Sequence, residues 1–144
     1  MLALRTGNEF DYIYVDDPAV DTDHPGVVKA FLDYTESGDR SLLPLRTGAT
    51  PTVFKLKRIS RAAYEHCRRQ GSAVDIYREA VCYGLVSISD FGQPGPMKLK
   101  HTRGEHGDRL SDESLEAIYA YELIAALGEQ VLKFYTLPPS KGQR

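Results

Sequence analysis

The sequence predicts a small α+β protein, in which a short antiparallel sheet packs with three to four helices. Residues 10–15 are rich in aromatic and β-branched side chains, which is typical of a strand. Residues 52–59 alternate apolar and basic side chains, which indicates a second strand. From residue 60 onward, apolar residues recur at helical spacing. A chain of 144 residues fits one domain, so we expect a single domain over 1–144.

An acidic loop and a short helix are expected after the first strand. The loop covers 16–26 and contains two prolines, which favour turns. Apolar residues at helical spacing then predict a helix over 27–35, and Ser37-Gly38-Asp39 stops it. Residues 41–51 contain two prolines and a glycine, so no regular element is predicted there.

The second strand carries the clearest alternation in the chain. Phe54 and Leu56 point to one face, and Lys55 and Lys57 point to the other. We expect this strand to pair with the first one.

Two helices are predicted next, over 60–70 and 73–86. Ser60 is a suitable N-cap for the first. Ser72 followed by Asp75 gives the S-x-x-D pattern that starts the second.

The C-terminal half is expected to contain a long loop, one long helix and a short tail. Residues 90–109 hold glycines, prolines and many charges, and a loop of that length is usually functional or mobile. Ser111 caps a helix predicted over 112–135, and a tail follows at 138–144. Its apolar stripe consists of Leu115, Tyr119, Leu123, Leu127, Val131 and Phe134.

Composition excludes some classes of function and leaves others open. The net charge is −2, which gives the whole molecule no electrostatic attraction to DNA or to an anionic membrane. Charge is unevenly distributed, since residues 1–50 carry four basic and nine acidic side chains and residues 51–109 carry eleven and six. No apolar stretch is long enough to span a membrane, and the first residues do not resemble a signal peptide. Cys67 and Cys82 are expected to be reduced.

No group of residues predicts a catalytic or metal site. The acidic cluster at 16–24 lacks the alternating ligands of a calcium loop. His101 and His106 have no further zinc ligands nearby. His66 and Cys67 are neighbours on a helix and point about 100° apart, so they do not form a thiol–base pair. We therefore expect a non-enzymatic protein with no catalytic, cofactor-binding or metal-binding residues.

A basic stretch between residues 55 and 69 is the one feature that favours contact with nucleic acid. The sequence pI of about 6.1 does not support a DNA-binding footprint. Lysines on an edge strand also protect it from aggregation.

One arrangement along the chain resembles a known group of proteins. It runs from Thr6-Gly-Asn-Glu-Phe-Asp-Tyr12 through Pro51-Thr-Val-Phe-Lys-Leu-Lys-Arg-Ile-Ser60 and Tyr77-Arg-Glu-Ala-Val-Cys-Tyr-Gly-Leu85 to Leu110-Ser111 and Leu137-Pro138. This order resembles small proteins encoded in the structural-gene modules of tailed bacteriophages. They include capsid-associated proteins and proteins like tail assembly chaperones.

The resemblance implies a virion-associated structural protein, made in the host cytoplasm, that acts as a capsid cement or minor head component. Its expected partners are other phage structural proteins, the major capsid protein first among them, with self-association as a further option. Two alternatives stay open, a tail assembly chaperone absent from the mature virion and a small regulatory or nucleic-acid-binding protein. The partner-binding residues expected are Tyr12, Tyr14, Lys55, Lys57, Arg58, Met97, Lys98, Lys100, Arg103 and Tyr135.

Overall fold

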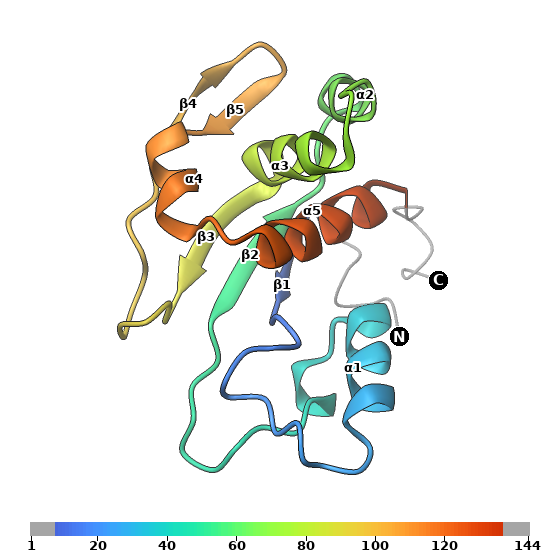
Figure 1. The fold of residues 1–144 in the computed structure, drawn as a ribbon, viewed down its shortest axis with the longest axis vertical. Helices are drawn as coiled ribbons and strands as arrows, with labels where there is room; N and C mark the ends of the chain where they lie inside the picture. The colour runs from blue at the N-terminus through green and yellow to red at the C-terminus, as the bar shows by residue number, and fades with distance from the viewer. Residues whose placement is uncertain (1–7, 137–144) are drawn as a thin grey trace. The chain divides into compact units, whose positions relative to one another are not determined.

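The computed structural model describes residues 8–136, which form a small α+β fold and confirm the predicted fold class (Figure 1). The helices are α1 (Val27–Ser37), the 3-10 turn η2 (Arg40–Leu42), α2 (Arg61–Arg68), α3 (Ala73–Gly84), α4 (Asp112–Ile118) and α5 (Tyr121–Thr136). The strands are β1 (Glu9–Tyr12), β2 (Val53–Lys57), β3 (Leu85–Ser89), β4 (His101–Gly104) and β5 (Gly107–Leu110). The predicted tail at 138–144 lies outside the described residues.

The chain divides into two compact units. Within the described residues, unit 1 comprises 8–55 and 88–97, and unit 2 comprises 56–87 and 98–136. Along the chain, the division between the units falls inside strand β2 and inside strand β3. The single domain expected over 1–144 stays a prediction.

The larger sheet is antiparallel, with the strand order β1-β2-β3. The predicted pairing of the first two strands is therefore confirmed. Strand β1 ends earlier than predicted, because the chain turns back where the N–H of Asp17 donates to the carbonyl of Tyr14 at 3.0 Å. In β2, Phe54 and Leu56 are buried and the lysines between and after them are half-buried, as the alternation predicts.

Strand β3 is absent from the predicted elements. The helix predicted over 73–86 ends at Gly84, and the chain continues directly into an extended strand. Leu85 and Ile88 are both buried in this strand. Its short apolar run has no clear period, so the run did not distinguish a strand from the last turn of a helix.

The predicted loop at 90–109 is also partly wrong. Residues 101–110 form a β-hairpin, in which β4 pairs antiparallel with β5. Gly104 faces Gly107 across a two-residue turn, and Gly107 has φ +117°, a conformation that favours glycine. The strands hold few apolar residues, so their sequence lacks the usual strand signal.

The long helix predicted over 112–135 is two helices, α4 and α5. Tyr119 between them has φ −70° and ψ 113°, which is extended backbone. Its side chain is 38% exposed, although the predicted stripe places it in the core. The flanking members Leu115 and Leu123 are buried.

Tyr34 connects α1 with β1 and the residue after it through two hydrogen bonds within unit 1. Its hydroxyl accepts a hydrogen bond from the Ile13 N–H and donates one to the Asp11 carbonyl, both at 2.9 Å. The side chain is 1% exposed. A tyrosine that is buried with both hydrogen bonds made stabilises the helix against the strand.

Side-chain caps begin three of the helices as the sequence predicts. Ser60 accepts from the Ala63 N–H, Ser72 from the Asp75 N–H and Ser111 from the Ser114 N–H. No helix of the described chain is long and apolar enough to cross a membrane.

Candidate functional site

The ten predicted partner-binding residues are divided between the two units. Tyr12, Tyr14, Lys55 and Met97 belong to unit 1, and the remaining six to unit 2. Tyr12 is 3% exposed, so its ring contributes to the core and does not reach the surface. Three of the others are exposed, namely Lys98, Lys100 and Arg103. The remaining six are half-buried, namely Tyr14, Lys55, Lys57, Arg58, Met97 and Tyr135.

Several of these side chains already have partners inside their own unit. Lys55 forms an ion pair with Asp11 at 3.4 Å. Arg58 donates to the carbonyl oxygens of Phe134 at 2.7 Å and of Tyr135 at 3.2 Å, at the end of α5. Tyr135 stacks on Tyr64, with ring centroids 4.0 Å apart.

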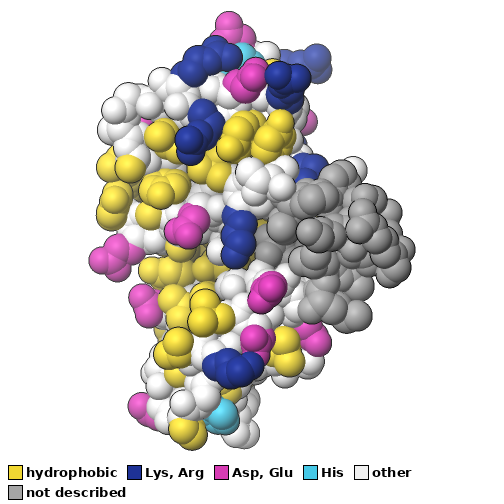
Figure 2. Space-filling view, turned by 90° about the vertical axis from the view of Figure 1, so that its right-hand side faces the viewer, with side chains coloured by type: hydrophobic (Ala, Val, Ile, Leu, Met, Phe, Trp, Pro, Cys, Tyr) yellow, Lys and Arg dark blue, Asp and Glu magenta, His cyan; other side chains and the backbone are white. Residues whose placement is uncertain are grey.

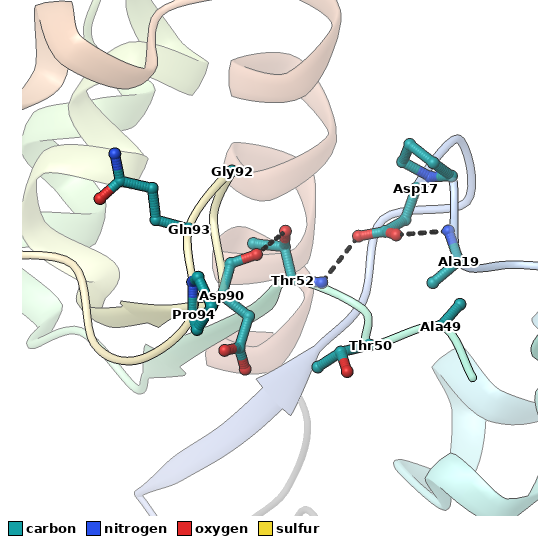
Figure 3. A pocket seen from close by; sticks show the side chains of 10 residues that line it. Asp17, Ala19, Ala49, Thr50, Thr52, Asp90, Gly92, Gln93 and Pro94 are labelled. Atoms are coloured by element: carbon teal, nitrogen blue, oxygen red, sulfur yellow. Dashed lines mark hydrogen bonds between the residues drawn. The ribbon is translucent and has the colours of Figure 1, made fainter.

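Unit 1 contains a cavity of about 450 Å³ beside Asp17 and Asp90 (Figure 3). Asp17 is 7% exposed, and its two oxygens accept from the N–H groups of Ala19 and Thr52, each at 2.8 Å. The Thr52 hydroxyl donates to the Asp90 carbonyl at 2.9 Å. The Asp17 carboxylate therefore connects the segment at Ala19 with the segment at Thr52 within unit 1.

Asp90 has a similar role in its own turn. It has φ +60°, which is unusual for a residue with a side chain. One carboxylate oxygen accepts from the Gly95 N–H at 2.8 Å and so stabilises the turn at 90–95. Both carboxylates of this cavity therefore have structural hydrogen bonds.

Unit 2 contains a cluster of ionisable groups around Glu79. This side chain lies on α3 and is buried. One oxygen accepts from His66 Nε2 at 2.9 Å, and the other from Arg109 at 2.8 Å. The guanidinium of Arg78 lies 3.6 Å from the second oxygen.

The pKa of Glu79 reflects these neighbours. Burial by itself raises the pKa, but the hydrogen bonds from His66 and Arg109 outweigh it, so the pKa lies below its ordinary value. The carboxylate is thus ionised at neutral pH. It fixes the imidazole of His66 and the guanidinium of Arg109 in one place.

Aromatic rings extend this cluster toward the hairpin. The ring of His66 lies 4.8 Å from that of His106 and 5.7 Å from that of Tyr83, centroid to centroid. The third pair, Tyr83 and His106, is 6.0 Å apart. Helices α2 and α3 and the β4–β5 turn each contribute one ring.

A smaller cavity of about 230 Å³ lies beside these rings in unit 2. It is lined by Lys57, Arg58, Ile59, Ser60, Ala63, Tyr83, His106, Gly107 and Asp108. Of the predicted partner-binding residues, only Lys57 and Arg58 line it.

The two thiols are buried near the cluster. Cys67 and Cys82 are both free and fully buried. Burial raises the pKa of Cys67 to about 12 and that of Cys82 to about 11. A thiol with a raised pKa is a poor nucleophile at neutral pH.

The histidines of the predicted loop have separate roles. His101 Nε2 lies 2.8 Å from the carbonyl oxygen of Leu85, whereas His106 belongs to the ring cluster. In the part of the chain that the structure describes, no three ligands are placed to hold a metal ion.

Sequence reasoning missed Glu79, Tyr83 and Arg109 as members of one cluster. Glu79 is 13 residues from His66 and 30 from Arg109, so only the tertiary fold brings them together. No motif spacing signals such a group. We found no family model, no curated protein and no solved structure that matches this chain.

Proposed function

We propose that the protein acts by binding other protein chains, as a virion-associated structural protein of a tailed phage. Within that class it is a capsid cement or minor head component. The phage part of the proposal rests on the resemblance in the order of the sequence. The observation that carries the binding part is the exposed apolar face of α1.

Helix α1 is apolar on two faces. Tyr34 is buried and Phe31 half-buried on one side, where their rings lie 6.1 Å apart. Val28 and Leu32 are 72% and 61% exposed, and they are one helical turn apart. A helix that is apolar on both faces is typical of one covered on both. The exposed face with Val28 and Leu32 therefore supports the proposal that a partner packs on α1.

Further exposed apolar side chains accompany this pair. In unit 1, the turn η2 packs against α1 and carries Leu42, which is 41% exposed. Unit 2 has an exposed ring of its own, Tyr121, which is 53% exposed and is not part of the α1 face. Figure 2 shows that hydrophobic side chains reach the surface on one face, between charged ones. Mixed apolar and polar surface of this kind is common in protein interfaces.

The partner favoured by this proposal is the major capsid protein. The alternative partner is a tape-measure protein, which a tail assembly chaperone would bind. The two differ in one observable property, because a cement protein stays in the particle and a chaperone leaves it.

Mass spectrometry of purified phage particles tests the proposal. The expected result is that peptides of this chain are found in mature, infectious particles, at a constant ratio to the major capsid protein. Particles from which the chain is missing, while it is abundant in the infected cell lysate, would contradict a cement role. Co-purification with a tape-measure protein in that lysate would then favour the chaperone.

A further inference from the structure

The β4–β5 hairpin of unit 2 has an open outer edge, which is a different surface from the apolar face of α1. Among the described residues this sheet consists of β4 and β5, so β4 has a strand neighbour on one side only. Strand β5 packs against α3, and in Figure 1 it lies between α3 and β4. An edge strand of this kind can pair with a strand from another chain.

The register shows which main-chain groups of this edge point outward. Gly104 pairs with Gly107 across the two-residue turn. Antiparallel pairs alternate between those that exchange main-chain hydrogen bonds and those that do not, and a tight turn is closed by a hydrogen-bonded pair. Every second residue from Gly104 therefore faces β5, and the Lys100 carbonyl does accept from the Ser111 N–H at 2.8 Å. The residues whose main-chain groups point away from β5 are Leu99, His101 and Arg103.

These outward main-chain groups are available for pairing. Within residues 8–136, no hydrogen bond is made to them. His101 and Arg103 are exposed, so the edge is accessible from solvent. The imidazole of His101 lies 2.8 Å from the Leu85 carbonyl oxygen and so helps to hold β4 in place. A row of N–H and C=O groups that only water satisfies can bind an extended chain by strand addition.

Unpaired positive charge accompanies this edge. Residues 91–104 contain two lysines, one arginine and no acidic residue. Lys98, Lys100 and Arg103 are exposed, and none of them forms an ion pair with another described residue. All three are among the partner-binding residues expected from the sequence. Opposite charges on neighbouring strands stabilise a sheet, so this edge favours a strand with acidic side chains.

The same charges disfavour pairing between the β4 strands of two copies of this chain. In such a pair, the cations of one strand would lie beside the cations of the other. Like charges opposite each other destabilise a sheet, and native proteins use lysine on edge strands to prevent pairing with their own copies. The charge therefore selects an acidic partner over a second copy.

We propose that the outer edge of β4 binds an extended acidic segment of another protein, which adds to the hairpin as a further strand. The main chain of that segment pairs with His101 and Arg103. Side chains at alternate positions of a strand share a face, so acidic residues two positions apart reach Lys98 and Lys100 together. The inference goes beyond the proposed function, since it rests neither on the α1 face nor on the phage resemblance.

Titration of the full chain with a short synthetic peptide that alternates glutamate and valine, followed by ¹H–¹⁵N NMR, tests the inference. The amide protons of His101 and Arg103 are expected to shift downfield in a saturable way, because each N–H gains a main-chain acceptor. The dissociation constant should lie below about 1 mM. The double variant Lys100→Gln and Arg103→Gln should bind about tenfold more weakly, because two cross-strand charge pairs are lost.

Two control peptides separate strand addition from attraction between charges. The glutamate peptide with N-methyl groups along its whole backbone keeps the charge but has no N–H donors. The same sequence with lysine in place of glutamate keeps the donors but reverses the charge. Neither peptide should give saturable shifts at His101 and Arg103.

A matched variant controls for the net charge of the protein. Arg68→Gln with Lys133→Gln removes the same charges at exposed positions of α2 and α5, and should leave the affinity unchanged. Absence of saturable shifts with the glutamate peptide, equal binding of either control peptide, or an equal loss of affinity in the two double variants would overturn the inference.

Discussion

Two glycines let helices α3 and α5 approach closely in unit 2 (Figure 1). A Cβ on Gly128 of α5 would lie 2.6 Å from the carbonyl oxygen of Tyr77 on α3. A Cβ on Gly84 of α3 would lie 2.5 Å from a methyl group of Val131 on α5. Neither glycine has positive φ, so the close approach, not backbone conformation, requires them.

Gly128→Ala is therefore expected to destabilise the protein. The added methyl group meets backbone atoms that cannot move alone, so the free energy of unfolding should fall by about 2 kcal/mol. Urea denaturation measures this value. Gly71→Ala is the control, because a Cβ there has nothing within 4 Å, and its effect should be within about 0.5 kcal/mol. Equal effects of the two substitutions would contradict the close packing.

Glu79 is the residue on which the pH dependence of stability depends most clearly. Its pKa is lower in the folded protein than in the unfolded chain, so the unfolded chain binds more protons in the acidic range. The stabilisation is present above the unfolded pKa, and it is lost as the pH falls through the folded pKa.

Glu79→Gln should lower the free energy of unfolding at neutral pH by about 2 kcal/mol, since two partner groups lose a charged acceptor. The difference from the parent protein should shrink as the pH falls from the ordinary carboxyl range through the lowered pKa of Glu79, because the parent carboxyl then becomes protonated too. Denaturation curves at several pH values measure this difference. Glu129→Gln removes an exposed carboxylate of α5 and should show little pH-dependent difference. If Glu79→Gln lowered the free energy of unfolding by the same amount at every pH, the lost ion pairs would not be the cause of the destabilisation.

At the scale of elements, the break between α4 and α5 decides how the C-terminal part of the chain is built. The Tyr119 N–H donates to the Glu116 carbonyl at 3.3 Å, and the Ile124 N–H donates to the Ala120 carbonyl at 2.9 Å. Tyr121 is thus the first residue of a new helix. The N–H of a first helical residue has no acceptor within its helix.

Tyr121→Pro distinguishes two helices from one. Proline is tolerated at the first position of a helix, so we expect a loss of less than about 1 kcal/mol in the free energy of unfolding. Glu129→Pro, in the interior of α5, should cost about 3 kcal/mol or more. Circular dichroism with urea denaturation measures both losses. If 112–135 were one continuous helix, both substitutions would lower the free energy of unfolding by about 3 kcal/mol or more.

The elements that the sequence predicts correctly carry a local signal. Strand β2 has a regular alternation, and the caps Ser60, Ser72 and Ser111 stand just before apolar periodic segments. The break at Tyr119 has no proline or glycine to mark it. The break follows from tertiary packing, because Leu115 and Leu123 are buried while Tyr119 is exposed.

The candidate site is less predictable than the fold for the same reason. Lys57 and Arg58 were among the expected partner-binding residues. Tyr83 and His106 reach the same cavity from α3 and from a hairpin turn that was predicted to be a loop. Their proximity is a property of the three-dimensional packing, and no spacing along the chain encodes it.

At the scale of the whole molecule, charge follows the division into units. The acidic loop at 16–26 belongs to unit 1, and the basic α2 belongs to unit 2. The exposed face of α1 and the cavity beside Tyr83 likewise belong to different units.

Co-sedimentation of the protein with phage heads assembled without it tests most directly whether the α1 face binds a partner. The double variant Val28→Asp and Leu32→Asp places two charges on that face, and its apparent affinity should fall by about tenfold or more. The control Gln93→Asp and Thr47→Asp adds the same charges at exposed polar positions and should bind like the parent. Both variants should remain folded, because all four side chains are exposed. Undiminished binding of the Val28 and Leu32 variant would contradict the account.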